Sequence, residues 1–189
     1  MKIIARRLTA TLAAAALFSV GCGATEEDTQ PQVELTEEEQ VSAEIDALTG
    51  SQAILWAKVV IALAKYRDVN QALADGYIPV SGCESVPGLG GMGIHYLNPA
   101  LARDLASDPF KPELLLYAPN SAGGLDLLGP EYFQAEAGQP RPNVAGQPFD
   151  GPMPGHNPNM PVHYDLHAWL FKYNPSGLFA PFNPRVTCQ

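Results

Sequence analysis

Histidine and methionine residues recur together in the second half of this 189-residue chain. Each internal methionine stands three residues before a histidine, in the pairs Met92 and His95, Met153 and His156, and Met160 and His163. The fourth histidine, His167, follows four residues after the last pair. Imidazole and thioether groups together suit copper, and imidazoles without sulfur also suit zinc. The alternative is that these methionines fill an irregular core, as this flexible side chain often does.

The segment 161–171 has a pattern that fits both a strand and a helix. A strand would place His163, Asp165 and His167 on one face, with Asp165 between the two rings and able to orient either of them. A helix would bring the two histidines close enough to share one ion. On a regular strand they are roughly 13 Å apart, too far to share an ion without a bulge. We favour the strand, because aromatic residues are enriched and a turn follows at 174–177.

Either structure leaves room for a metal site that draws ligands from other segments. His95 could meet His163 or His167 from a neighbouring element, and Glu131 could supply a carboxylate. His156 and the methionines would form a looser set in a Pro-rich loop. Two or three histidines with one carboxylate are a common ligand set for zinc, non-haem iron and copper. The sequence therefore predicts a transition-metal site, with copper or zinc as the ion.

The role of such a site is left open by the sequence. One alternative is a small metal-dependent hydrolase or oxygenase, in which Glu131 or Asp165 serves as the base beside a metal-bound water. Another is a metal-free module of the cell envelope that binds a protein or glycan partner through Tyr96, Tyr164, Trp169 and the Pro-rich loop. In that case the histidines would be half-buried and hydrogen-bonded for structure alone.

The first 22 residues have the pattern of an export signal. Three basic residues precede an apolar run from Leu8 to Val20, which is too short to span a bilayer comfortably. The run ends in Phe-Ser-Val-Gly-Cys at positions 18–22, which resembles the lipobox of bacterial lipoproteins, where cleavage leaves an acylated cysteine at the new N-terminus. Ser19 stands where that family usually has leucine, which leaves an ordinary signal peptidase site as the alternative.

The lipobox resemblance implies a signal peptide over residues 1–21, acylation of Cys22 and attachment to the cell envelope through a lipid anchor. Gly23 stands where an aspartate is associated with inner-membrane retention, so the resemblance implies the outer membrane rather than the inner one. Several acyl chains would anchor the protein stably, where a single chain would not.

Export also bears on the two remaining cysteines. Once Cys22 is acylated, Cys83 and Cys188 are left as a pair in an oxidising compartment, which predicts a disulfide. The bridge would tie the C-terminal tail to the loop that leads to His95. Metal ligation by the two thiols is the competing interpretation, but the pair lacks the short spacing of thiolate motifs.

The mature chain would be strongly acidic. The whole sequence has a formal net charge of −9 at pH 7, and removal of residues 1–21, which hold three basic residues and no acid, leaves −12. Seven acids and no basic residue lie between Cys22 and Glu39. This composition predicts a solvated tether over residues 22–45. The overall charge argues against a nucleic-acid partner.

The remaining residues, 46–189, have the length and composition of a single globular domain. Ser51 can cap a long helix whose apolar positions run broadly around it until Gly76 ends it. A helix with so wide an apolar surface is expected to be buried against one face of a sheet. A shorter helix is predicted from Thr36 to Leu48, where Glu39 completes a capping box.

Strands are predicted in the second half of the domain. Residues 113–133 indicate a hairpin with a turn at 120–124 and a bend near Gly129 in its second arm. The segment 161–171 would add a third antiparallel strand. The predicted fold class is α+β, with a long N-terminal helix packed on a small antiparallel sheet and long Pro- and Gly-rich loops.

Two segments rich in glycine or proline connect these elements. Residues 88–93 match the letters of the dinucleotide-binding fingerprint. However, the sequence predicts no strand directly before this segment and no helix directly after it, as that motif requires. We therefore predict no nucleotide cofactor, and a Gly-rich turn that positions His95. Seven prolines between Pro140 and Pro161 argue against regular structure, and loops of this length in a compact domain are commonly functional.

The segments 92–99 and 162–169, with the turn at 174–177, resemble those of uncharacterised exported bacterial proteins. This resemblance covers most of the globular domain and supports treating residues 46–189 as one unit. It implies no activity.

Overall fold

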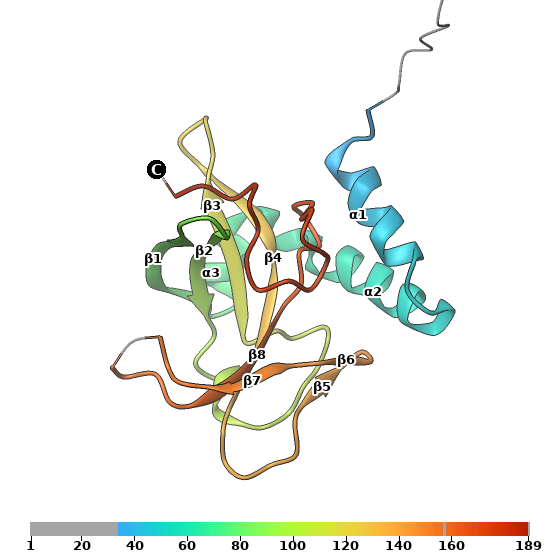
Figure 1. The fold of residues 1–189 in the computed structure, drawn as a ribbon. Helices are drawn as coiled ribbons and strands as arrows, with labels where there is room; N and C mark the ends of the chain where they lie inside the picture. Colours follow the sequence, from blue (N-terminus) through green and yellow to red (C-terminus); the bar gives the residue numbers. More distant parts are fainter. Residues whose placement is uncertain (1–33, 157, 189) are drawn as a thin grey trace, which may run out of the picture. The chain divides into compact units, whose positions relative to one another are not determined.

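Three short α-helices precede a six-stranded antiparallel sheet in the part of the chain that the computed structural model describes, residues 34–156 and 158–188. The predicted signal peptide, the lipidation site Cys22 and the start of the acidic segment lie outside these residues. No helix within the described ranges is long and apolar enough to cross a membrane. The predicted fold, a long N-terminal helix on a small sheet, is wrong, because strands dominate and the helices are short (Figure 1).

Helix α1 (Glu37–Asp46) begins at the predicted capping box. The Thr36 side chain accepts the backbone N–H of Glu39, and the Glu39 carboxylate accepts the backbone N–H of Thr36 at 2.8 Å. This reciprocal pair satisfies N–H groups that a helix start leaves unpaired. Val41 and Ile45 are buried and join the main core, so this part of the acidic segment is helical and packed.

The predicted long helix over residues 51–75 is broken into three pieces. They are helix α2 (Gly50–Leu63), the 3₁₀ turn η1 (Ala64–Arg67) and helix α3 (Val69–Ala74). A continuous helix would use the Tyr66 carbonyl to accept the N–H of Asn70. That carbonyl instead accepts the hydroxyl of Tyr117 at 2.8 Å, and the N–H of Asn70 donates to the Asp68 carboxylate at 3.0 Å. A tertiary contact and a side-chain cap therefore replace one turn of helix.

Helix α2 buries one face only. Trp56, Val59 and Leu63 are buried, whereas Ile54 and Ile61 are 61% and 77% exposed. The wide apolar surface that the sequence indicated is therefore buried only in part. The apolar surface of α2 is wider than the single stripe of the helix that packs against the core.

The chain enters the six-stranded sheet after α3. Gly76 ends the helix as predicted, with a φ of 92° that favours glycine. The strands are β1 (Ile78–Val86), β2 (Gly90–Leu97), β3 (Leu114–Pro119), β4 (Leu125–Ala135), β7 (Asp150–Met153) and β8 (His163–His167). Their order is β1-β2-β3-β4-β8-β7, and a 3₁₀ turn η2 (Leu101–Arg103) separates β2 from β3. The sheet curls, so that β7 runs roughly across the direction of β3 in Figure 1.

The predicted hairpin and the predicted third strand are confirmed. Strands β3 and β4 pair antiparallel, and β8 pairs antiparallel with β4. Leu116 pairs with Gly129 and Tyr117 with Leu127. This shift of register leaves Leu128 as an extra residue in β4, which is a β-bulge at the place where a bend was expected.

Two strand-forming regions were not expected from the sequence. The Gly-rich segment 88–93 lies in a hairpin formed by β1 and β2. The Pro-rich segment 140–161 was expected to lack regular structure, which is wrong. It contains β5 (Asn143–Val144), β6 (Gln147–Pro148) and the edge strand β7. An edge strand tolerates Pro152, because one side of such a strand needs no N–H donor.

The sheet packs through both of its faces. One face joins the helices in the main core, which includes Trp56, Leu115, Tyr117, Tyr132 and Leu166. The other face carries a smaller cluster of Leu116, Leu128, Trp169 and Val186. Alternation along β8 therefore turns His163, Asp165 and His167 away from the helices.

The C-terminal tail closes over the smaller cluster. The predicted disulfide joins Cys83 in β1 to Cys188, with 5.4 Å between their Cα atoms. Asn183 forms a backbone bridge with Gly91 in β2. Gly90 allows this approach, because a Cβ there would lie 2.2 Å from the Asn183 carbonyl oxygen.

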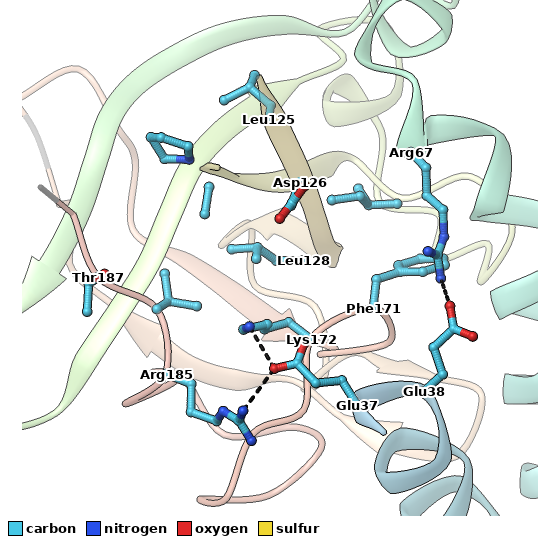
Figure 2. A pocket seen from close by; sticks show the side chains of 14 residues that line it. Glu37, Glu38, Arg67, Leu125, Asp126, Leu128, Phe171, Lys172, Arg185 and Thr187 are labelled. Carbon is cyan, nitrogen blue, oxygen red and sulfur yellow. Dashed lines mark hydrogen bonds and ion pairs between the residues drawn. The ribbon is translucent and has the colours of Figure 1, made fainter. Parts of the chain in front are cut away.

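Ion pairs connect the start of α1 to the C-terminal segment (Figure 2). The Glu37 carboxylate lies 2.7 Å from the ammonium of Lys172 and 3.1 Å from the guanidinium of Arg185. Glu38 pairs with Arg67 at 2.8 Å. These residues line a cavity of about 400 Å³, whose walls carry three basic and three acidic side chains. The cavity is therefore balanced in charge.

Candidate metal centre

His95, Glu131 and His167 lie together on the sheet face that is turned away from the helices. They come from β2, β4 and β8, and one ligand atom of each lies within 4.8 Å of the other two. Glu131 and His167 are direct cross-strand partners, whereas β3 separates β4 from the strand of His95. This buried group could hold a metal ion.

A glycine and a bulge in β4 bring the strands of the site close together. A Cβ at Gly129 would lie 1.9 Å from the carbonyl oxygen of Ala168, so only glycine lets the chain after His167 pack directly on β4. The bulge at Leu128 bends β4 and increases its local twist. Glu131 follows this bend by three residues and meets His167 across the strand pair.

The three side chains are almost entirely buried, with exposed fractions of 8% for His95, 2% for Glu131 and 3% for His167. Burial lowers the pKa of His95 to about 3 and also lowers the pKa of His167, because an imidazolium would lose its hydration. Burial raises the pKa of Glu131 well above its ordinary value, and the negative charges of Asp165 and Glu84 add to this effect. Burial therefore favours the uncharged form of all three side chains when no ion is bound.

Ser81 in β1 fixes the ring of His95. The Ser81 hydroxyl accepts the backbone N–H of His95 at 3.1 Å and lies 2.9 Å from ring Nδ1 and 2.7 Å from the Gly82 carbonyl. A carbonyl can only accept, so the single hydroxyl proton goes to Gly82 and Nδ1–H donates to Ser81. The lone pair of Nε2 then faces Oε2 of Glu131 at 3.4 Å, which is the orientation that metal ligation requires.

Two of the three side chains present buried polar atoms without a hydrogen-bond partner. Among the described residues, neither Oε2 of Glu131 nor Nε2 of His167 has such a partner. Native proteins pair almost all of their buried polar atoms, and each exception calls for an explanation such as a bound ion or water. An ion between these atoms would satisfy both at once.

The ligand set consists of two imidazole nitrogens and one carboxylate oxygen. Such a set suits Zn²⁺ and other divalent transition metals, whereas Cu(I) prefers sulfur. Three protein ligands leave at least one coordination position open. This arrangement is typical of catalytic zinc sites, in which the open position holds water or substrate, and not of structural sites, which are closed by four protein ligands.

The other predicted site residues lie beside this group and not within it. Nε2 of His163 is 3.5 Å from Oδ2 of Asp165, and its Nδ1–H donates to the Pro161 carbonyl at 3.1 Å. His156 is exposed, with its ring 5.3 Å from that of His163. As expected for a strand, Asp165 lies between the two rings of β8. The structure thus brings together His95, Glu131 and His167 but places His163 beside Asp165 and His156 beside His163.

Aromatic rings pack against the histidines of β8. The ring of Trp169 stacks on His167, with 6.1 Å between centroids and 15° between planes, and its Nε1–H donates to the Ala180 carbonyl at 2.6 Å. Phe133 stacks on His163 at 5.2 Å. These rings keep water away from the imidazoles and restrict their rotation.

A cavity of about 340 Å³ adjoins the group. His95 and Glu131 form part of its wall, and Ser81, His156 and Met160 also line it. Two of the three proposed ligands are therefore reached from this cavity. By contrast, the described lining of the charged cavity in Figure 2 includes no histidine.

The sequence indicated the three residues of this group but not the residues that support them. Ser81 was missed because the β1–β2 hairpin, which places it beside His95, was not predicted. Trp169 was noted only as a surface for a partner. The one signal for its stacking on His167 was that an alternating strand would place both residues on the same face. That signal alone does not show that the two rings touch.

Comparison with known proteins found no matching family model, no matching curated protein and no matching solved structure. The function is therefore argued from the site itself.

Proposed function

We propose that the protein binds one divalent transition-metal ion at His95, Glu131 and His167. The observation that carries this proposal is the convergence of three buried side chains from three strands, whose ligand atoms lie within 4.8 Å of one another. Two of these side chains hold an unpaired polar atom in the described interior. Leaving such an atom unpaired costs about 1–3 kcal/mol, and a bound ion removes that cost.

Zinc is the first choice of ion and copper(II) the second. Both accept imidazole and carboxylate ligands, and zinc imposes no geometric preference of its own. Nothing in the donor set of His95, Glu131 and His167 selects copper(I), because it lacks sulfur. Copper(II) binds most nitrogen and oxygen sites more tightly than zinc, so the ion taken up in the cell depends on supply as well as on the site.

The open coordination position supports a reactive centre over a structural one. A divalent ion at such a site lowers the pKa of a bound water and polarises an oxygen of a bound molecule. Glu131 cannot serve as the base once it is a ligand. Asp165 remains as the nearby carboxylate for that role in a metal-dependent hydrolase or oxygenase.

Export to the cell envelope and anchoring through Cys22 complete the proposal. The disulfide between Cys83 and Cys188 supports export, because disulfides persist in oxidising compartments. Replacing Cys22 with serine should move the protein from the membrane to the soluble fraction, and separation of inner and outer membranes should place the wild type in the outer one. Unchanged membrane retention of Cys22→Ser would contradict the anchor.

Metal binding is tested with the exported chain carrying Cys22→Ser, freed of metal by a chelator and titrated with zinc in a calorimeter. We expect one ion per chain with at least micromolar affinity. Glu131→Gln and His167→Gln should each weaken binding by about 100-fold or more, because each removes a ligand from a set of three. His156→Ala should leave binding unchanged.

Glu113→Gln is the matched control for Glu131→Gln. Glu113 is also buried, and its carboxylate accepts the N–H of Phe133 at 3.0 Å, but it is not part of the ligand group. It should retain zinc affinity. Failure of the wild type to take up zinc or copper(II) would overturn the proposal, and so would full affinity in a protein lacking both His95 and His167.

A further inference from the structure

We propose that the cavity beside the metal centre binds a small, mostly apolar molecule, about the size of one substituted aromatic ring, which coordinates the metal through a single donor atom. This inference rests on the metal binding proposed above and assigns the class of ligand that the centre receives. It follows from where the cavity lies, what lines it and how large it is.

The cavity and the metal centre share residues. His95 and Glu131 belong to the ligand group and also line the cavity, so a molecule inside it lies next to two of the three ligands. His167 does not line the cavity in the described structure. The open side of the centre therefore faces the cavity, because Trp169 covers the ring of His167.

The walls of the cavity favour an uncharged, apolar body. Most of the lining side chains are apolar, and they include Val80, Leu97, Leu114, Phe133, Met160 and Pro161. The described residues of the wall include no lysine or arginine, whereas Glu84 and Glu131 are acidic. An anionic group on the part of the ligand that lies away from the metal would therefore find no positive charge to pair with.

The size of the cavity limits the ligand. Its volume of about 340 Å³ is at the small end of the range of ligand sites, roughly 300–1,000 Å³. Met160 and Pro161 of the Pro-rich segment line the cavity together with residues of β1 to β4. Methionine adapts its shape to different contacts, so this wall suits a range of ring-sized molecules.

The experiment compares two probes with the same donor atom on cobalt-loaded protein. Co²⁺ replaces zinc and reports its ligands through visible absorption. Imidazole presents the donor alone, and 4-phenylimidazole adds one apolar ring. We expect both to change the Co²⁺ spectrum and 4-phenylimidazole to bind about 10-fold to 100-fold more tightly, as burial of a phenyl group predicts.

Variants that fill the cavity test its part in this preference. Ala135 and Ala102 line the cavity without belonging to the ligand group, so Ala135→Leu and Ala102→Leu should abolish the advantage of 4-phenylimidazole and leave Co²⁺ affinity and imidazole binding unchanged. Ala118→Leu makes the same change in the wall of the charged cavity and should keep the advantage. Because two different positions are filled, the test still holds if one of the two variants does not fold.

The outcomes separate this inference from the metal binding on which it rests. If Co²⁺ binds but imidazole leaves its spectrum unchanged, the centre has no open position and the inference fails while metal binding stands. Equal affinity for the two probes, or a full phenyl advantage in both filling variants, would also overturn it. If none of Co²⁺, zinc and copper(II) is bound, both proposals fail.

Discussion

Glu131 and His167 are direct partners across strands β4 and β8, and each holds a buried polar atom that has no hydrogen-bond partner in the described structure. Their alignment is set by the register of the two strands. A slip by one residue would turn His167 toward the helices and remove it from the site. The close packing of Gly129 against the Ala168 carbonyl lies just beyond this pair and supports its register, so a feature that shapes the sheet also forms the site.

Replacing Ser81 should weaken metal binding without removing a ligand. Ser81 accepts the ring Nδ1–H of His95 and thereby keeps Nε2 available to the ion. We expect Ser81→Ala to lower zinc affinity by about 10-fold to 100-fold, as is usual for residues that orient a histidine ligand. Ser85→Ala, on the same strand, should have no effect. Equal affinities of both variants in calorimetric titration would show that the His95 ring needs no such support.

The methionines separate zinc from copper(I). Met160 lines the cavity beside His95 and Glu131, whereas Met92 lines a different cavity with Cys83. Because zinc gains little from a thioether, Met160→Leu and Met92→Leu should change zinc affinity by no more than a few-fold. A large loss of copper(I) affinity in Met160→Leu alone, measured by competition with a copper(I) chelator, would show that sulfur completes the site and would favour copper.

Local patterns in the sequence predicted those elements whose causes are local. The Thr36–Glu39 capping box, the hairpin over 113–133 and the alternation along β8 all depend on residues close together in the chain, and the structure confirms them. The helix break is different, because Tyr117 captures the Tyr66 carbonyl from 51 residues away. No pattern within the helix itself indicates that contact.

Which residues form the ligand group also depends on contacts between distant segments, namely the register and the curvature of the sheet. From the sequence alone, His163 and His167 were equally good candidates as the partner of His95. The pairing of β4 with β8 places His167 opposite Glu131, and it pairs His163 with Ala135 at the far end of the strand. Which histidine joins the site is therefore decided by long-range strand pairing. The strand prediction had only excluded that both histidines bind one ion.

The contacts of α1 should make a modest and salt-dependent contribution to stability. Glu37 bridges Lys172 and Arg185, and these side chains are partly buried. We expect Glu37→Gln to lower the free energy of unfolding by about 1 kcal/mol at low salt and by less at high salt. Glu38→Gln removes a more exposed pair with Arg67 and should cost less. Urea unfolding at two salt concentrations measures both, and equal effects of the two variants would contradict the bridge.

Glu113 should make the protein less stable as the pH rises. Its side chain is buried and accepts the N–H of Phe133 at 3.0 Å. Burial raises the pKa of Glu113 to about 7 from an ordinary value of 4.5. The folded state therefore holds this proton more tightly than the unfolded state does. The associated stability is fully present below about pH 4.5 and is lost as the pH rises through 7.

The variant Glu113→Gln keeps an acceptor for Phe133 but cannot ionise. In urea unfolding we expect it to match the wild type near pH 4 and to exceed it by on the order of 2 kcal/mol at pH 8, because the wild type must then bury a charge or take up a proton. Glu131, whose pKa burial also raises, remains in the variant, so part of the decline with pH persists. If the two proteins differ in free energy of unfolding as much at pH 4 as at pH 8, the cause is packing and not ionisation. At pH 4 the side chain at position 113 is neutral in the folded state of both proteins.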